Sequence, residues 1–158
     1  MAYRLGVRSR IKLIGVHPML CRIVREAVAI TDQDFAVVDG LRGADQQRDL
    51  VARGASQTLK SKHLRQRDGY GHAVDLVPVV GGVARWEWPL IYPVARAMWT
   101  VAHRYGTAMT WGGVWDRQFL DLSPAAIEIE VEHYVQRRRK LGRSAFIDGP
   151  HYQLEGEL

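Results

Sequence analysis

The feature that most constrains this chain is a set of metal-ligand side chains placed far apart in the sequence. His63 and Asp75 lie near the middle of the chain, and a second histidine, His151, lies far downstream. Two neutral imidazoles and one carboxylate are a common ligand set for zinc, with the fourth position left to water. Asp148, three residues before His151, is an acid that can act on that water. The pattern therefore predicts a hydrolytic zinc site rather than a structural one.

The cysteine content limits which ligands are available. Cys21 is the single cysteine of the chain, which excludes an internal disulfide framework and any site built from several thiolates. A bound metal must therefore be held by histidine and carboxylate. Cys21 falls in an apolar stretch, so we expect a buried, inert thiol.

Size and charge bound the class of protein. A chain of 158 residues with 47% hydrophobic and 25% charged residues predicts one globular domain spanning residues 1–158. No run of about 18 apolar residues is present, so we expect no membrane span. The basic N-terminus has no apolar segment behind it, so we expect no secretory signal peptide. The net charge of +5 favours an anionic partner, such as nucleic acid, acidic lipid or cell wall.

Hydrophobic periodicity predicts an α+β fold. Apolar residues at helical spacing and helix-start residues predict helices beginning at residue 18 and over 44–52, 89–105 and 123–141. Short β-rich or alternating runs predict strands at 35–38, 73–77, 107–111, 145–147 and 151–154. Residues 56–71 are polar and glycine-rich, so we expect an exposed loop that carries His63. Residues 1–16 are expected to lead into the domain.

The histidine segments also resemble a known family. Ser61-x-His63 followed by Gly71-x-Ala73-x-Asp75 resembles the Ser-x-His…Gly-x-Ala-x-Asp signature of zinc peptidases related to D-alanyl-D-alanine carboxypeptidases and dipeptidases, the VanY-like group. Within that group the chain is most similar to phage endolysins that cleave the L-alanyl–D-glutamate bond of peptidoglycan. Further segments follow the family's order: Gly15-Val-His17-Pro18, Phe35-x-Val-x-Asp-Gly40-Leu-Arg42, Trp86-x-Trp88-Pro, Trp111-Gly-Gly and Asp148-Gly-Pro-His151.

The resemblance implies a fold and a role for each site residue. It implies a single domain with a small antiparallel sheet that bears the zinc site and is flanked by helices. One Zn²⁺ per chain would be held by His63, Asp75 and His151. Asp148 would be the catalytic acid that takes a proton from the attacking water and passes it to the leaving amine. Arg42 would steady the polarised carbonyl or a substrate carboxylate.

Two segments depart from the family pattern. The loop over 64–70 is about five residues longer than the family's pattern, at a small cost in chain entropy. A helical insertion over 116–141 lengthens the region before Asp148, and we expect it to cover one side of the cleft.

The implied function is that of an endolysin without a separate cell-wall-binding module. Its partners would be peptidoglycan stem peptides, with no nucleic acid and no stable membrane insertion, and we expect a monomer. The protein would be made in the host cytoplasm and released by a phage pore protein to act on peptidoglycan in the periplasm. A D-alanyl-D-alanine carboxypeptidase with the same metal site is the nearest alternative. A non-catalytic zinc protein that binds cell wall or nucleic acid is the alternative of another class. The ligands alone do not separate zinc from other divalent ions.

We expect structural rather than catalytic roles for Ser61, the other histidines, three tryptophans and the basic run. We expect His17 to cap a helix, Ser61 to orient the His63 loop, and His72 to face away from Asp75 in a surface or packing role. His103 and His133 are predicted to be ordinary helix residues. Trp86, Trp88 and Trp111 are predicted to lie in the core or the cleft wall. The basic run over 137–140 is interpreted as a solvated helix end rather than a binding patch.

Overall fold

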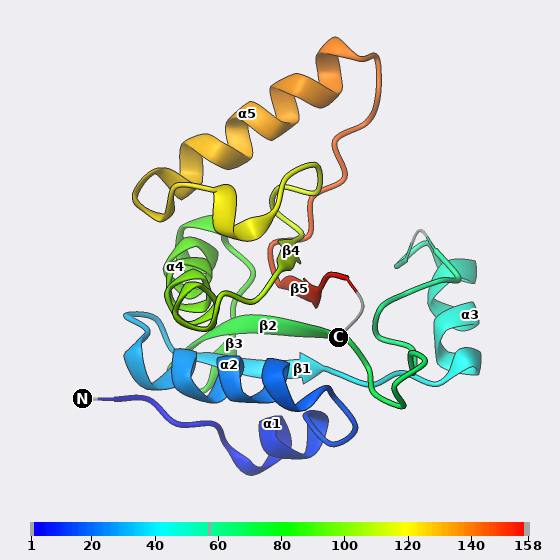
Figure 1. The fold of residues 1–158 in the computed structure, drawn as a ribbon, viewed down its shortest axis with the longest axis vertical. Helices are drawn as coiled ribbons and strands as arrows, with labels where there is room; N and C mark the ends of the chain where they lie inside the picture. The colour runs from blue at the N-terminus through cyan, green and yellow to red at the C-terminus, as the bar shows by residue number, and fades with distance from the viewer. Residues whose placement is uncertain (1, 57, 157–158) are drawn as a thin grey trace.

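The computed structural model describes residues 2–56 and 58–156 (Figure 1). The helices are α1 (Val7–Lys12), α2 (Pro18–Ile30), α3 (Ala44–Ala52), α4 (Trp88–Tyr105) and α5 (Ile127–Lys140), with 3₁₀ turns η1 (Phe119–Asp121) and η2 (Pro124–Ala126). The strands are β1 (Phe35–Asp39), β2 (Ala73–Val80), β3 (Val83–Ala84), β4 (Met109–Trp111) and β5 (His151–Leu154). The predicted α+β class is confirmed.

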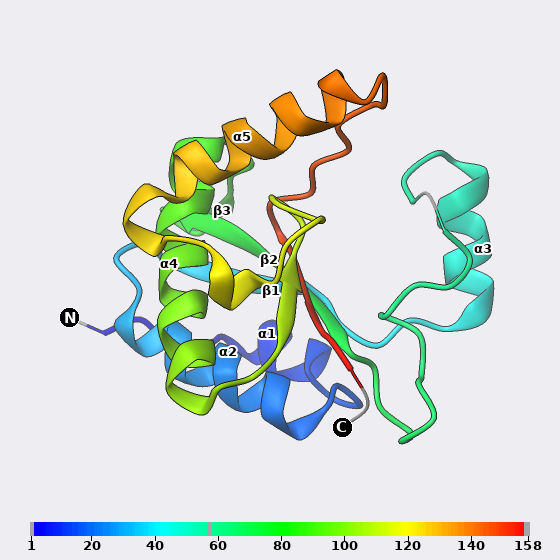
Figure 2. The same cartoon turned by 45° about the horizontal axis from the view of Figure 1, so that its top comes forward.

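The strands form one antiparallel sheet in the order β1-β2-β5-β4, with β3 paired to β2. The order is not sequential, because β5 inserts between β2 and β4. This insertion places the end of the chain against its middle, as the red and green strands show in Figure 2.

The core lies where α2 and α4 pack against each other and against the sheet. Both helices carry the predicted apolar stripe, because residues three and four apart share one face. Cys21 on α2 is buried as expected. Gly106 ends α4 in the left-handed conformation with a φ of 61°, which glycine adopts without steric cost. No helix of the described residues is both long and apolar enough to cross a bilayer.

The segment before β5 differs from the prediction in two places. The expected helix over 123–141 is broken into η2 and α5 at Ala126, whose φ of −120° is not helical. Ser123 makes no side-chain cap; its N–H instead donates to Glu130. The strand predicted at 145–147 is wrong, since this segment is irregular coil. Its Phe146 side chain stacks on Trp115, and the Asp148-Gly-Pro turn follows at once.

Two further expectations are corrected. Residues 1–16 are more than a lead-in, because they contain α1, which packs on β1. Trp86 is not in the core or the cleft wall, since 62% of its surface is exposed. Trp111 is fully buried and Trp88 packs against the core, as predicted.

Helices α3 and α5 project on two sides of the sheet, and the ends of β2 and β5 lie between them (Figures 1 and 2). The loop that follows α3 returns toward the sheet and carries His63. Residues from three distant parts of the sequence therefore meet at this end of the sheet.

Candidate metal centre and active site

His63 is held by its own loop and by the turn after β1. The Ser61 hydroxyl accepts the His63 backbone N–H at 3.1 Å, which confirms the predicted orienting role of Ser61. The His63 ring Nδ1 lies 2.8 Å from the Gly40 carbonyl oxygen. A carbonyl can only accept, so Nδ1 carries the hydrogen and Nε2 presents a lone pair. Gly40 fits closely there because a Cβ would overlap the carbonyl oxygen of Lys12.

Asp75 and His151 face each other across the sheet. They are directly paired in the antiparallel ladder of β2 and β5, so their side chains project on the same face. His151 Nε2 lies 2.8 Å from the Gln153 side-chain oxygen, and the Gln153 amide donates to Glu155 at 2.7 Å. These two hydrogen bonds place the hydrogen of the His151 ring on Nε2 and leave a lone pair on Nδ1.

The two lone pairs converge on one carboxylate oxygen. His63 Nε2 and His151 Nδ1 each lie 3.2 Å from Asp75 Oδ1, and the three ligand atoms lie within 4.8 Å of one another. Two imidazole lone pairs facing a carboxylate repel unless a cation or protons lie between them. In a tetrahedral zinc site, ligand atoms about 2.1 Å from the metal are roughly 3.4 Å apart. The donor set therefore fits a divalent cation such as zinc.

The protein groups alone shift the pKa values at this site. Burial raises the pKa of Asp75, but when the His151 and His63 rings are protonated their hydrogen bonds and positive charge outweigh it and hold the pKa far below its usual range. Burial lowers the pKa of His151, but Asp75, Gln153 and Asp148 together raise it by more. The site is thus strongly predisposed to hold positive charge beside an ionised carboxylate.

Asp148 lies beside the three donors without joining them. Its backbone N–H donates to the Gly112 carbonyl at 2.8 Å, and its own carbonyl accepts the His151 N–H at 3.0 Å. Burial and the charge of Asp75 raise the pKa of Asp148, which brings it toward the range useful for proton transfer. The structure places Asp148 in the pocket that His63 and His151 also line.

Arg42 is more constrained than the sequence suggested. Its guanidinium donates to Asp39 at 2.5 Å, to Gln47 at 3.0 Å and to the second oxygen of Asp75 at 3.2 Å. Gln47 is in turn anchored by donating to Ser56 at 2.9 Å. Arg42 therefore orients Asp75 while also lining the pocket.

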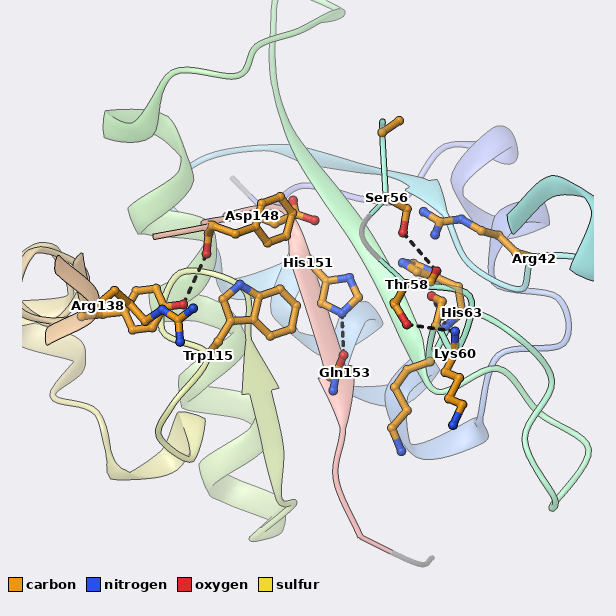
Figure 3. A pocket seen from close by; sticks show the side chains of 15 residues that line it. Arg42, Ser56, Thr58, Lys60, His63, Trp115, Arg138, Asp148, His151 and Gln153 are labelled. Carbon is orange, nitrogen blue, oxygen red and sulfur yellow. Dashed lines mark hydrogen bonds between the residues drawn. The ribbon is translucent and has the colours of Figure 1, made fainter. Parts of the chain in front are cut away.

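The pocket itself has a volume of about 450 Å³. Figure 3 shows His151 between two walls: Trp115, Arg138 and Asp148 lie on one side, and Arg42, Ser56, Thr58, Lys60 and His63 on the other. Sequence reasoning missed Gln153, Trp115 and Arg138. Gln153 could have been found from the sequence, because it lies two residues after His151 on a predicted strand and such residues share a face.

The other histidines have structural roles. His17 Nδ1 accepts the Met19 N–H at 3.0 Å, so the predicted cap is confirmed. His72 is buried, faces away from the metal donors and lies 2.7 Å from Asp68 of the long loop over 64–70. His103 stacks on Trp99 within α4, and His133 is an exposed residue of α5.

Comparison with known proteins decides the family. The family described as phage L-alanyl-D-glutamate peptidase matches residues 1–133. The chain belongs to this family. It is therefore a peptidase, as the resemblance implied. The match includes His63 and Asp75, whereas Asp148 and His151 lie beyond it.

Two individual proteins are also similar to this chain. The L-alanyl-D-glutamate peptidase of Escherichia phage T5 is 28% identical over 120 residues, which cover 73% of this chain and 84% of that protein. The crystal structure of the Serratia marcescens L-Ala D-Glu endopeptidase ChiX superposes with a TM-score of 0.70 at 34% identity. That superposition covers 96% of this chain and 90% of ChiX.

Proposed function

We propose that this peptidase is a zinc-dependent endolysin that hydrolyses the L-alanyl–D-glutamate bond of peptidoglycan stem peptides. The observation that carries the proposal is the convergence of His63 Nε2 and His151 Nδ1 on Asp75 Oδ1, at 3.2 Å each, in one pocket with Asp148. The names of the matched family and relatives support the choice of bond.

His63, Asp75 and His151 would hold the ion. When bound, zinc supplies Lewis acidity, which polarises the scissile carbonyl and makes water a stronger acid. The carbonyl of Gly40 and the amide of Gln153 hold the two rings with their lone pairs toward the ion. Arg42 keeps the Asp75 carboxylate in place through its second oxygen, so the ligand geometry is fixed before substrate arrives.

Asp148 moves the proton. Its carboxylate accepts a proton from the attacking water and then donates it to the amine of the leaving glutamate residue. Its raised pKa suits a group that must both accept and release a proton near neutral pH. Arg42 keeps its guanidinium on the pocket side of Asp75, where it would also offer a hydrogen bond to the developing oxyanion.

The proposal also covers where the enzyme works and in what form. It would be made in the host cytoplasm and reach the periplasmic peptidoglycan during lysis, after release through a phage pore protein. It would act as a monomer on the stem peptides, without binding nucleic acid. Membership of a phage peptidase family supports this setting.

The test is mass spectrometry of purified Gram-negative peptidoglycan after digestion, with and without a chelator. We expect chelator-sensitive release of peptides that begin with D-glutamate, with L-alanine left on the glycan. Loss of only a terminal D-alanine would assign the carboxypeptidase activity instead. No cleavage by folded, zinc-loaded protein would reject both activities.

The variant Asp148→Asn separates catalysis from binding. We expect it to lose roughly 10²–10⁴-fold in turnover, the usual contribution of a general acid–base. Its zinc content should match the wild type, because Asp148 is not a ligand. Unchanged turnover would remove Asp148 from the mechanism.

A further inference from the structure

One wall of the pocket comes from α5 and the coil that follows it. Tyr134 and Arg138 lie one turn apart on α5, and Phe146 follows in the coil. Tyr134 is buried, and its hydroxyl donates to the Phe146 carbonyl at 3.4 Å, which ties the coil to the helix. Trp115 stacks on Phe146 and packs against the His151 ring. This wall is therefore a built surface that extends from Arg138 to the metal donors.

Arg138 differs from three other arginines on or beside α5. Those arginines are paired with acids: Arg96 with Glu128, Arg117 with Glu130 and Arg137 with Asp116. Arg138 donates its Nε–H to the Ser144 carbonyl at 3.0 Å, and within residues 2–56 and 58–156 it forms no ion pair. That hydrogen bond holds the side chain while its two terminal nitrogens remain available at the pocket. The sequence-based interpretation of 137–140 as only a solvated helix end is therefore incomplete.

The position of Asp148 indicates which part of the substrate reaches this wall. Asp148, Trp115 and Arg138 lie on the same side of His151 (Figure 3). The proposed function has Asp148 protonate the leaving amine, so the residue that carries this amine occupies the same side of the pocket. That residue is a glutamate, which retains one free carboxylate when its other carboxyl continues the peptide. A guanidinium binds a carboxylate through two parallel hydrogen bonds.

We propose that Arg138 is a specificity-determining residue that binds the free carboxylate of the glutamate on the leaving side of the scissile bond. The inference rests on the proposed function and adds to it the recognition of one substrate group. Trp115 and Phe146 line the same pocket as Arg138, and apolar neighbours strengthen an ion pair by lowering the local dielectric constant. Arg138 does not touch the reacting atoms, so it acts through substrate binding and orientation.

The test compares two peptides with the L-alanyl–D-glutamate bond, one with the free carboxylate and one with that carboxylate amidated. Wild-type protein, Arg138→Ala and Arg138→Lys are assayed for kcat/KM on both. Arg139→Ala is the matched control, because Arg139 is the next residue of the same basic run, is exposed and does not line the pocket. Zinc content and thermal melting are measured for every variant.

We expect Arg138→Ala to lower kcat/KM on the free acid by roughly ten- to a hundred-fold, the usual worth of a charged hydrogen bond. Its kcat/KM on the amide should stay within about two-fold of wild type, since the charge pair is already absent there. Arg138→Lys should retain part of the preference for the free-acid peptide, because lysine keeps the positive charge but lacks the paired N–H donors of the guanidinium. Arg139→Ala should match wild type on both peptides.

Three outcomes overturn the inference. Equal losses on both peptides would show a general effect on the site, and wild-type behaviour of Arg138→Ala would show that the carboxylate is bound elsewhere. If zinc-loaded wild type cleaves neither peptide, the proposed function fails and the inference falls with it. If wild type cleaves both and Arg138 has no selective effect, only the inference fails.

Discussion

Gly112 allows the Asp148 turn to dock against the end of β4, and Gly112→Ala tests how tightly that docking controls catalysis. A Cβ at Gly112 would overlap the Asp148 carbonyl oxygen and lie 2.9 Å from its carbonyl carbon and 3.1 Å from its Cβ. Carbon atoms prefer separations of about 3.5–4.0 Å, so the turn must move by roughly 0.6 Å or more. The φ of Gly112 is not positive, so the effect comes from this contact rather than from backbone strain.

A shift of this size should lower kcat. Misplacing a catalytic group by about 1 Å can cost roughly 10²-fold, so we expect kcat to fall by roughly ten- to a hundred-fold. Overpacking should also destabilise the fold by about 1–3 kcal/mol. Peptide hydrolysis gives kcat, and urea unfolding gives the stability change. Gly6→Ala is the control, because a Cβ at Gly6 meets nothing within 4 Å. Full activity in a stable Gly112→Ala protein would refute the argument that Gly112 sets the position of Asp148.

Three further predictions concern side-chain contacts at the metal donors, in the core and on the surface. Gln153→Ala removes the acceptor of the His151 ring hydrogen, so zinc affinity should fall by roughly ten- to a hundred-fold; a competition titration with a chelator measures this, and unchanged affinity would contradict it. Phe119→Ala should cost about 3–5 kcal/mol in urea unfolding, because Phe119 is fully buried against two aromatic rings; a loss below about 1 kcal/mol would mean that this cluster is loosely packed. Arg137 holds the pKa of Asp116 below its usual range, so the pair stabilises the protein above pH of about 4 and this contribution disappears as the pH falls through the lowered pKa. Arg137→Ala should therefore cost about 0.2–1 kcal/mol at pH 7, as expected for a partly exposed pair, and less at pH 3, whereas equal losses at both pH values would assign the effect to packing.

The sequence was most informative where a structural feature depends on neighbouring residues. The stripes of α2 and α4, the His17 cap and the end of α4 at Tyr105 are local patterns, and all were predicted correctly. A candidate ligand set was also accessible, since few residue types bind zinc and the single Cys21 removed the thiolate alternative. The structure brings His63, Asp75 and His151 together as that reasoning required.

Features that depend on how distant elements pack were not accessible. The coil at 145–147 has strand-like residues, but its Phe146 carbonyl accepts the Tyr134 hydroxyl instead of joining a ladder. The backbone bond to Gly112 is made by Asp148, after the coil. The place of Arg138 at the pocket depends on how α5 crosses the site, and helical periodicity carries no information about that. The role of Arg42 in holding Asp75 likewise depends on β1 lying beside β2.

The pairing of Asp75 with His151 has a consequence for how the enzyme matures. These residues are 76 positions apart in the chain, and β5 must insert between β2 and β4 before they meet. During synthesis, a nascent chain that ends before His151 has only His63 and Asp75 to offer, so it could not complete the proposed metal centre. Bringing Asp75 and His151 together closes a long loop, which costs chain entropy. An ion bound by both residues would offset that cost, because it would bind the folded state alone. Acquisition of the metal would then act as a checkpoint that couples activity to completion of the sheet, and a partly made or misfolded chain would be inert toward the cell that makes it.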